Sequence, residues 1–147
     1  MDDIKSLVTR FYDTWNAHDR DGWLACCYED ITFTGPGGVG GQGFDAGQMF
    51  WSLWQDAFPD CRCTINIAVA EGNEAIQESV FTGTHTETFR LPNSQDIPPT
   101  GKSVAIPYTL GLTYLGGTWS SFRLLGPSGA HDSIGAHADL RQGCTGL

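Results

Sequence analysis

Two long stretches of alternating hydrophobic and polar residues, at 75–86 and 103–114, constrain the fold more than any other feature of the sequence. A period of two is typical of a β-strand with one buried face. Similar alternation occurs at 62–71 and 119–125, and short glycine-containing turns connect two of the neighbouring pairs. Because parallel strands need long crossover connections, this spacing predicts an antiparallel meander. In the stretch at 62–71 the pattern places four hydrophobic residues on one face: Cys63, Ile65, Ile67 and Val69.

The chain before residue 62 has helical spacing instead. Hydrophobic residues recur at steps of three and four in residues 4–15 and 46–58, which predicts two amphipathic helices. Asp45 and Gln48 form a capping-box pattern at the start of the later helix. Helices followed by strands predict an α+β domain in which the helices cover one face of the sheet.

Shorter elements are expected between the two helices. A brief helix is predicted after Asp19 or Asp21, continuing through Cys27 and Tyr28, and a brief strand at 31–34. The glycine-rich run that follows, at 35–43, is predicted to be a loop.

Composition narrows the function. The chain has 147 residues, 12% of them aromatic, and a formal net charge of -9. A length of 147 residues predicts one domain, and the aromatic content is enough to line a small-molecule pocket as well as a core. The negative charge argues against nucleic acid and anionic membranes as partners. The N-terminus resembles no signal peptide and no stretch is long enough to span a membrane, so we expect a cytoplasmic protein with reduced cysteines.

Two glycine motifs resemble nucleotide-binding loops but lack their context. Gly38, Gly40 and Gly43 satisfy the GxGxxG spacing, yet no repeated alternation of strands and helices follows. Lys102 follows a glycine, but the upstream glycine of a phosphate-binding loop is missing. These motifs therefore predict no nucleotide site, and the glycine-rich run is expected to be a flexible loop at the mouth of a pocket.

His85 is the candidate catalytic residue in the strand at 75–86. Imidazole can accept and donate a proton near neutral pH. The strand alternation places it on the same face as Gln77 and Phe81, a mixed polar and apolar set that is typical of a pocket wall. The alternative is a histidine that is merely hydrogen-bonded at a sheet edge. Residues expected to shape the pocket, either as an aromatic cage or simply as core, are Tyr12, Trp15, Asn16, Thr34, Trp51 and Trp54.

The last part of the chain, residues 126–147, has neither helical nor strand periodicity, and we expect it to be an atypical tail after a single domain at 1–125. It contains four possible metal ligands with no framework to fix their geometry, so no metal site is predicted. These residues are His131, Asp132, His137 and Asp139.

The order of elements, together with Ala57-Phe58-Pro59-Asp60, Gly83-Thr84-His85-Thr86 and Pro98-Pro99-Thr100-Gly101-Lys102, resembles the SnoaL-like polyketide cyclase group of the NTF2-like superfamily over residues 1–125. The resemblance implies a conical α+β barrel with a curved antiparallel sheet wrapped on three helices around a deep cavity. It also implies a homodimer that uses no cofactor and catalyses an intramolecular aldol condensation or a related isomerisation on a hydrophobic small molecule. His85 would then orient the substrate or stabilise an enolate oxygen.

The end of the chain departs from that family. The group places a catalytic Asp at the end of the last strand and a Leu-rich helix after it, whereas Gly126-Pro127 stands at that point here. Asp132 is the candidate substitute acid, and a shifted reading frame near residue 125 is a second explanation, which translation of the neighbouring frame would test. Two alternatives therefore stay open: a non-catalytic binding protein of the same fold, and an epoxide hydrolase, although Arg90, Asp96 and Arg123 lack the spacing of its Asp, Arg, Asp network.

Overall fold

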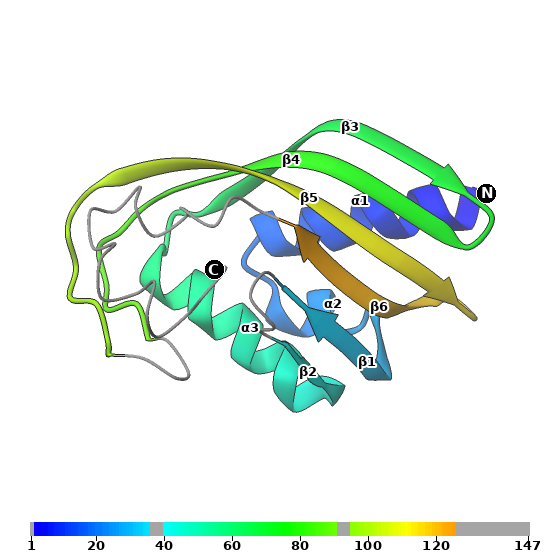
Figure 1. Ribbon diagram of the computed structural model, residues 1–147, viewed down its shortest axis with the longest axis horizontal. Coiled ribbons are helices and arrows are strands. Elements are labelled where there is room, and N and C mark those ends of the chain that lie inside the picture. Colours follow the sequence, from blue (N-terminus) through cyan, green and yellow to red (C-terminus); the bar gives the residue numbers. More distant parts are fainter. Residues whose placement is uncertain (1, 36–39, 91–94, 126–147) are drawn as a thin grey trace.

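The computed structural model describes residues 2–35, 40–90 and 95–125. Three helices and six strands follow one another along this part of the chain (Figure 1). Their order is α1 (Asp2–Asn16), α2 (Arg20–Leu24), β1 (Cys27–Thr34), β2 (Gly40–Gln42), α3 (Gly43–Ala57), β3 (Arg62–Glu71), β4 (Glu74–Thr84), β5 (Ser103–Leu115) and β6 (Thr118–Leu125).

The six strands form one curved, unclosed sheet with the order β2-β1-β6-β5-β4-β3. Strands β3 to β6 pair antiparallel with their neighbours in sequence, as the short connections predicted. Strand β1 pairs parallel with β6, so the first strand of the chain joins the end of the meander. The predicted α+β class with a curved sheet and three helices is confirmed. No helix of the described residues is long and apolar enough to cross a bilayer.

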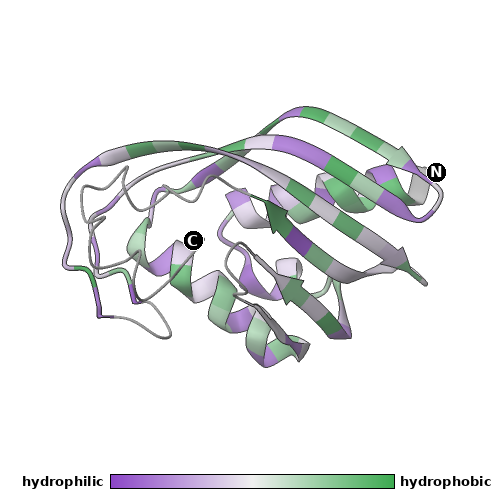
Figure 2. Ribbon diagram, viewed as in Figure 1, coloured by the Kyte–Doolittle hydropathy of each residue, from purple (hydrophilic) through white to green (hydrophobic). Residues whose placement is uncertain are grey.

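The sheet arches over α1 and α3, and its buried face points toward these helices (Figure 1). Polar and apolar residues are interleaved along the strands in Figure 2, and the burial of β4 alternates in step with this pattern. The core residues that α1 contributes occur at the helical spacing expected from the sequence. They are Ile4, Leu7, Val8, Phe11, Tyr12 and Trp15.

A β-bulge in β3 contradicts the predicted face of its outer half. Ile65 pairs with Ser79 and Ile67 with Glu78, so one extra residue, Asn66, lies between the two pairs. A single extra residue reverses the faces of a strand. Cys63 and Ile65 therefore lie partly buried, whereas Ile67 and Val69 are 54% and 59% exposed on the outer face. The prediction of four hydrophobic residues on one face was wrong for the last two.

Two boundaries also differ from the sequence prediction. Helix α2 ends at Leu24, and Cys27 and Tyr28 belong to β1, because β1 extends back to pair Cys27 with Trp119 of β6. Helix α3 begins at Gly43, two residues before Asp45, and its N-cap is Gln42 without a side-chain hydrogen bond. The predicted capping box is therefore not formed.

Two side-chain amides attach the end of α1 to the rest of the fold. Asn16 donates from Nδ2 to the carbonyl of Cys63 at 2.9 Å and accepts from the Cys63 N–H at 2.7 Å, which mimics a strand pairing. Gln55 of α3 donates at 3.0 Å to the carbonyl of Trp15, which lies at the end of α1 and also accepts from the N–H of His18. These contacts fix the position of the aromatic residues that α1 carries.

On the outer face of the sheet, Arg123 lies across Gly111 of β5. Its guanidinium donates to Thr113 at 2.7 Å and to Glu74 at 3.1 Å, which bridges β6, β5 and β4. A Cβ at Gly111 would come within 2.9 Å of the guanidinium, so a larger residue there would make Arg123 shift. Arg123 is therefore paired on the face opposite to the interior.

The turn after α3 is held to the end of β4 by Asp60. Its carboxylate accepts from the N–H of Thr84 at 2.7 Å and from the Thr84 hydroxyl at 2.8 Å. The backbone hydrogen bond from Thr84 is the largest cause of a lowered pKa for Asp60. The charged carboxylate thus stabilises the junction at which β4 leads into His85.

We predict that Asp60→Asn, which resembles the protonated acid, lowers the free energy of unfolding at pH 7. The effect should be only about 1 kcal/mol, because the carboxylate is solvent-exposed and water weakens its interactions. Because the pKa is lowered in the folded state, the contribution is complete above the ordinary Asp value of about 4 and is lost as the pH falls through the folded value. Urea unfolding at several pH values should show the difference from wild type disappearing in acid. An equal pH dependence for Asp13→Asn, which removes an exposed carboxylate elsewhere, would contradict this assignment.

Candidate functional site

Strand β4 carries a row of polar groups on the buried face of the sheet. Gln77 and Ser79 are 0% and 2% exposed, and Phe81 follows them on the same face. In the register of β4 with β5, Tyr108 lies opposite Ser79 and Leu110 opposite Gln77. The interior is thus polar at the centre of the sheet and apolar beyond it.

Tyr12 of α1 completes this polar centre from the helix side. Its hydroxyl is 2.9 Å from the Ser79 Oγ, and the Tyr108 hydroxyl faces both Tyr12 and Cys63. Burial raises the pKa of Tyr12 to about 12 and also raises the pKa of Tyr108 well above its ordinary value. Both phenols therefore remain neutral hydrogen-bond donors at physiological pH. We call Tyr12, Ser79 and Tyr108 the hydroxyl cluster.

Several polar groups of the interior have no hydrogen-bond partner among the described residues, including the indole Nε1 atoms of Trp23 and Trp119. Both amide atoms of Gln77 lack one, and so does the indole Nε1 of Trp15, one turn along α1 from Tyr12. Buried polar groups are almost always paired, so unpaired groups mark a place where a bound molecule or a water is expected.

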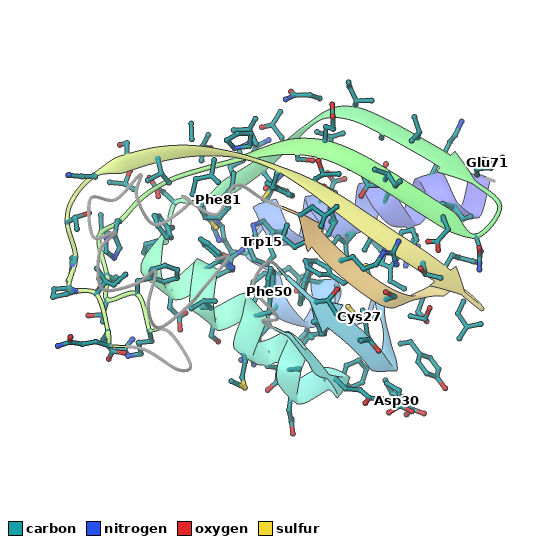
Figure 3. The ribbon with its side chains drawn as sticks, in the orientation of Figure 1. Trp15, Cys27, Asp30, Phe50, Glu71 and Phe81 are labelled. Atoms are coloured by element: carbon teal, nitrogen blue, oxygen red, sulfur yellow. The ribbon has the colours of Figure 1, made fainter. Side chains whose placement is uncertain are left out.

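The predicted aromatic residues separate into two groups. Trp15 and Trp51 pack edge to face with ring centroids 5.0 Å apart, and Phe50 lies 6.0 Å from Trp15. Trp54 instead packs against Phe81 at 5.3 Å, nearer the end of β4. Figure 3 shows Trp15, Phe50 and Phe81 beneath the arch of the sheet, whereas Asp30 and Glu71 lie at its periphery. The structure therefore does not contain a single cage formed by Tyr12, Trp15, Trp51 and Trp54.

His85 lies one residue beyond β4 and is fully buried. The backbone of His85 continues the ladder, because its N–H donates to Lys102 and its carbonyl accepts from Gly101. The ring Nδ1 is 3.0 Å from the Thr100 hydroxyl and accepts from the Thr100 N–H at 3.3 Å. The proton of the neutral ring is then on Nε2, which makes no hydrogen bond of normal geometry in the described part of the chain.

The environment of His85 keeps it neutral. Burial lowers its pKa, and a weaker interaction with the carbonyl of Glu87 acts in the opposite direction. Phe58 and Phe89 pack beside the ring, with centroids at 5.4 and 6.3 Å. His85 is thus arranged as a hydrogen-bond donor through Nε2, with its Nδ1 already occupied.

The other predicted site residues are Asn16, Thr34 and Asp132, and the structure describes the first two. Asn16 uses its amide on the backbone of Cys63, which assigns it to holding α1 against β3. Thr34 is exposed at the end of β1, next to Arg123 in the register of β6. Asp132 lies outside the described residues, as do the other possible metal ligands of the predicted tail.

A cavity of about 350 Å³ lies between α3, the β1–β2 pair and the segment after His85. Its wall includes Phe33, Met49 and Phe50, while Asp56 and Arg90 contribute its charged groups. Helical spacing alone did not indicate this role for α3, because Met49 then looks like an ordinary core position. Tyr108 was also missed, although a tyrosine within a row of aliphatic residues signals a buried hydroxyl that needs a partner.

The carboxylates lie outside the interior. Among residues 4–35, 40–90 and 95–125, every Asp and Glu side chain is exposed. The described part of the interior therefore offers neutral hydrogen-bond donors and acceptors, and no carboxylate that could act as a buried general base.

Comparisons with known proteins agree with this fold. The family model for the SnoaL-like domain matches residues 8–121. A candidate SnoaL-like polyketide cyclase from Jannaschia sp. CCS1 has a TM-score of 0.79 and 21% identity, covering 92% of this chain and 94% of that one. TsrD from Streptomyces laurentii has a TM-score of 0.76 and 18% identity, covering 91% and 96%. TerC, co-crystallised with polyporic acid, has a TM-score of 0.70 and 14% identity, covering 91% and 98%. No sequence of a curated protein matches the chain.

The hydrogen bonds of His85 give a spectroscopic prediction. At pH 7 the ring should be neutral with its proton on Nε2, and its titration midpoint should lie below the ordinary value of about 6.5. Long-range proton–nitrogen NMR spectra of the histidine side chains would identify the tautomer, and Thr100→Val should shift the Nδ1 resonance selectively. A protonated Nδ1 or a charged ring at pH 7 would contradict the donor assignment.

Proposed function

The chain belongs to the SnoaL-like domain family, and on this premise we propose that it is a cofactor-independent enzyme that cyclises or isomerises a hydrophobic, carbonyl-bearing small molecule of the polyketide type. The observation that carries the proposal is the hydroxyl cluster of Tyr12, Ser79 and Tyr108, which offers neutral donors inside an apolar interior. Such donors stabilise an oxygen that gains negative charge during a reaction.

In the proposed reaction a base removes a proton from a carbon next to a carbonyl. Donors of the hydroxyl cluster stabilise the resulting enolate oxygen, the enolate carbon attacks a second carbonyl of the same molecule, and the protonated base returns its proton to the new alkoxide. The proposed base is Asp132, which lies outside the described residues. Atoms and charge balance without an external reactant, so the reaction needs no cofactor.

His85 would serve as an anchor at the other end of the substrate. It is six residues beyond Ser79, a distance of about 20 Å along a strand, so one carbonyl does not reach both groups. An elongated, multi-ring molecule with several oxygen atoms fits this separation better than a compact one. Phe81 and Trp54 lie between the two polar positions and offer an apolar contact for the ring system.

A second candidate function is non-catalytic binding of the same class of molecule. It is favoured by the exposure of every described carboxylate, since a pocket without a base binds a carbonyl compound and does not deprotonate it. TerC, which was co-crystallised with polyporic acid, illustrates binding of a small molecule on a similar fold. An epoxide hydrolase has less support, because Arg123 is paired with Glu74 on the outer face.

We also propose that the protein acts as a cytoplasmic homodimer. The described cysteines are free thiols, which suits a reducing compartment. Ile67, Val69 and Ile76 form an exposed apolar patch on the outer face, where Val69 and Ile76 are paired neighbours. Exposed apolar patches of this kind often mark an interface between proteins.

The dimer proposal predicts that Ile67→Lys together with Ile76→Lys gives a monomer in sedimentation experiments at concentrations where the wild type is dimeric. The double variant Thr82→Lys and Thr109→Lys, with the same charge change on the same sheet, should stay dimeric. A wild-type monomer at all concentrations, or dissociation of both variants, would rule out this interface.

Turnover tests the main proposal. With a panel of aromatic polyketide esters, we expect Tyr12→Phe to lower kcat/KM by about tenfold to a hundredfold. We expect the main effect of Asp132→Asn to be a lower kcat, with a smaller change in KM. Tyr28→Phe, which alters an exposed tyrosine, should leave the kinetics unchanged. His85→Ala should act mainly on KM, since an anchor contributes similarly to substrate and transition state. Binding of panel members without turnover would favour the non-catalytic function.

A further inference from the structure

Gln77 is the most unusual polar residue of the interior. It lies in the middle of β4, it is fully buried, and both amide atoms lack a hydrogen-bond partner among the described residues. Its neighbours across the strands are Leu110 of β5 and Ala68 of β3, and neither side chain can bond to an amide. The unpaired donor and acceptor therefore belong to the same planar group.

A second buried glutamine shows that this arrangement is not imposed by the fold. Gln55 is 7% exposed, and it uses both amide atoms: Oε1 bonds to His18 Nδ1, and Nε2 donates to the carbonyl of Trp15. Burying an amide without partners is costly, whereas methionine or leucine would fill a similar volume without that cost. A glutamine at position 77 is thus best explained by a partner that binds there.

The surroundings define what that partner offers. The nearest polar groups along the buried face are neutral, since Ser79 is bonded to Tyr12 and no described carboxylate is buried. An anion would face the carbonyl oxygen of Gln77, and a simple ketone would leave that oxygen unpaired. A group with a donor and an acceptor side by side in one plane pairs with both amide atoms.

We infer that Gln77 is a recognition residue for an uncharged ligand group that presents a hydrogen-bond donor next to an acceptor, as a lactam does. This inference rests on the proposed function, because it assigns the chemistry of the molecule bound in the same interior.

Matched pairs of small probes test the inference. 2-Quinolone has the lactam edge, and coumarin has the same bicyclic shape with an ester oxygen in place of the N–H. 2-Piperidone is a monocyclic lactam, and δ-valerolactone has the same ring with an ester oxygen in place of the N–H. Titration calorimetry should give an affinity about tenfold higher for the donor-bearing member of at least one pair.

Variants of the protein test whether Gln77 causes a preference for the donor-bearing probe. In Gln77→Met the ratio of affinities within the discriminating pair should fall to about one, and the melting temperature without ligand should be equal to or higher than that of the wild type. Gln55→Met is the matched control: it should lower the melting temperature by several degrees, because satisfied bonds are lost, and keep the ratio.

The inference is overturned by equal affinities within both pairs, by a ratio that persists in Gln77→Met, or by a Gln77→Met variant that is destabilised as much as Gln55→Met. The last result would mean that a bound water or the protein itself satisfies the amide. If these outcomes occur while Tyr12-dependent turnover is found, the proposed function stands and only the role of Gln77 fails. If no probe and no panel compound binds, both fail.

Discussion

The pairing of the Asn16 side chain with the backbone of Cys63 is the contact on which the geometry of the interior depends. It attaches the end of α1 to the edge strand β3, and Gln55 of α3 holds the same end from the other side. Tyr12 lies one turn earlier on α1, so this attachment sets the distance between its hydroxyl and Ser79. An amide with reciprocal bonds to one backbone residue allows little sliding, and the helix therefore meets the sheet in one register.

Much of the architecture could be predicted because it follows from local periodicity. The alternation along β4 and β5 gave the meander and the buried face that carries Gln77, Ser79 and Phe81. The bulge at Asn66 could not be predicted, since alternation continues through it and only pairing with β4 reveals the extra residue. Cys27 was misassigned for a related reason: its strand character comes from its partner Trp119, which is distant in sequence.

The site was less accessible to sequence reasoning than the fold. Asn16 was expected to face a ligand, but its partner is 47 positions away in the sequence and the contact depends on how α1 meets β3. His85 was identified from its chemistry, whereas its protonation pattern depends on Thr100, across an irregular segment. The separation between His85 and the hydroxyl cluster also emerges only in three dimensions, and it replaces one expected site with two polar positions joined by aromatic rings.

The extra residue in β3 has a consequence for how this surface can change. Ile67 and Val69 are exposed because the backbone is one residue longer than regular pairing with β4 needs, and their identity alone does not determine their environment. Loss of one residue there would exchange the inward and outward sets over the outer half of the strand and replace the exposed Ile67 and Val69 with the smaller Ala68 and Ala70. The character of this exterior is thus encoded in chain length, so insertions and deletions can alter it more abruptly than substitutions.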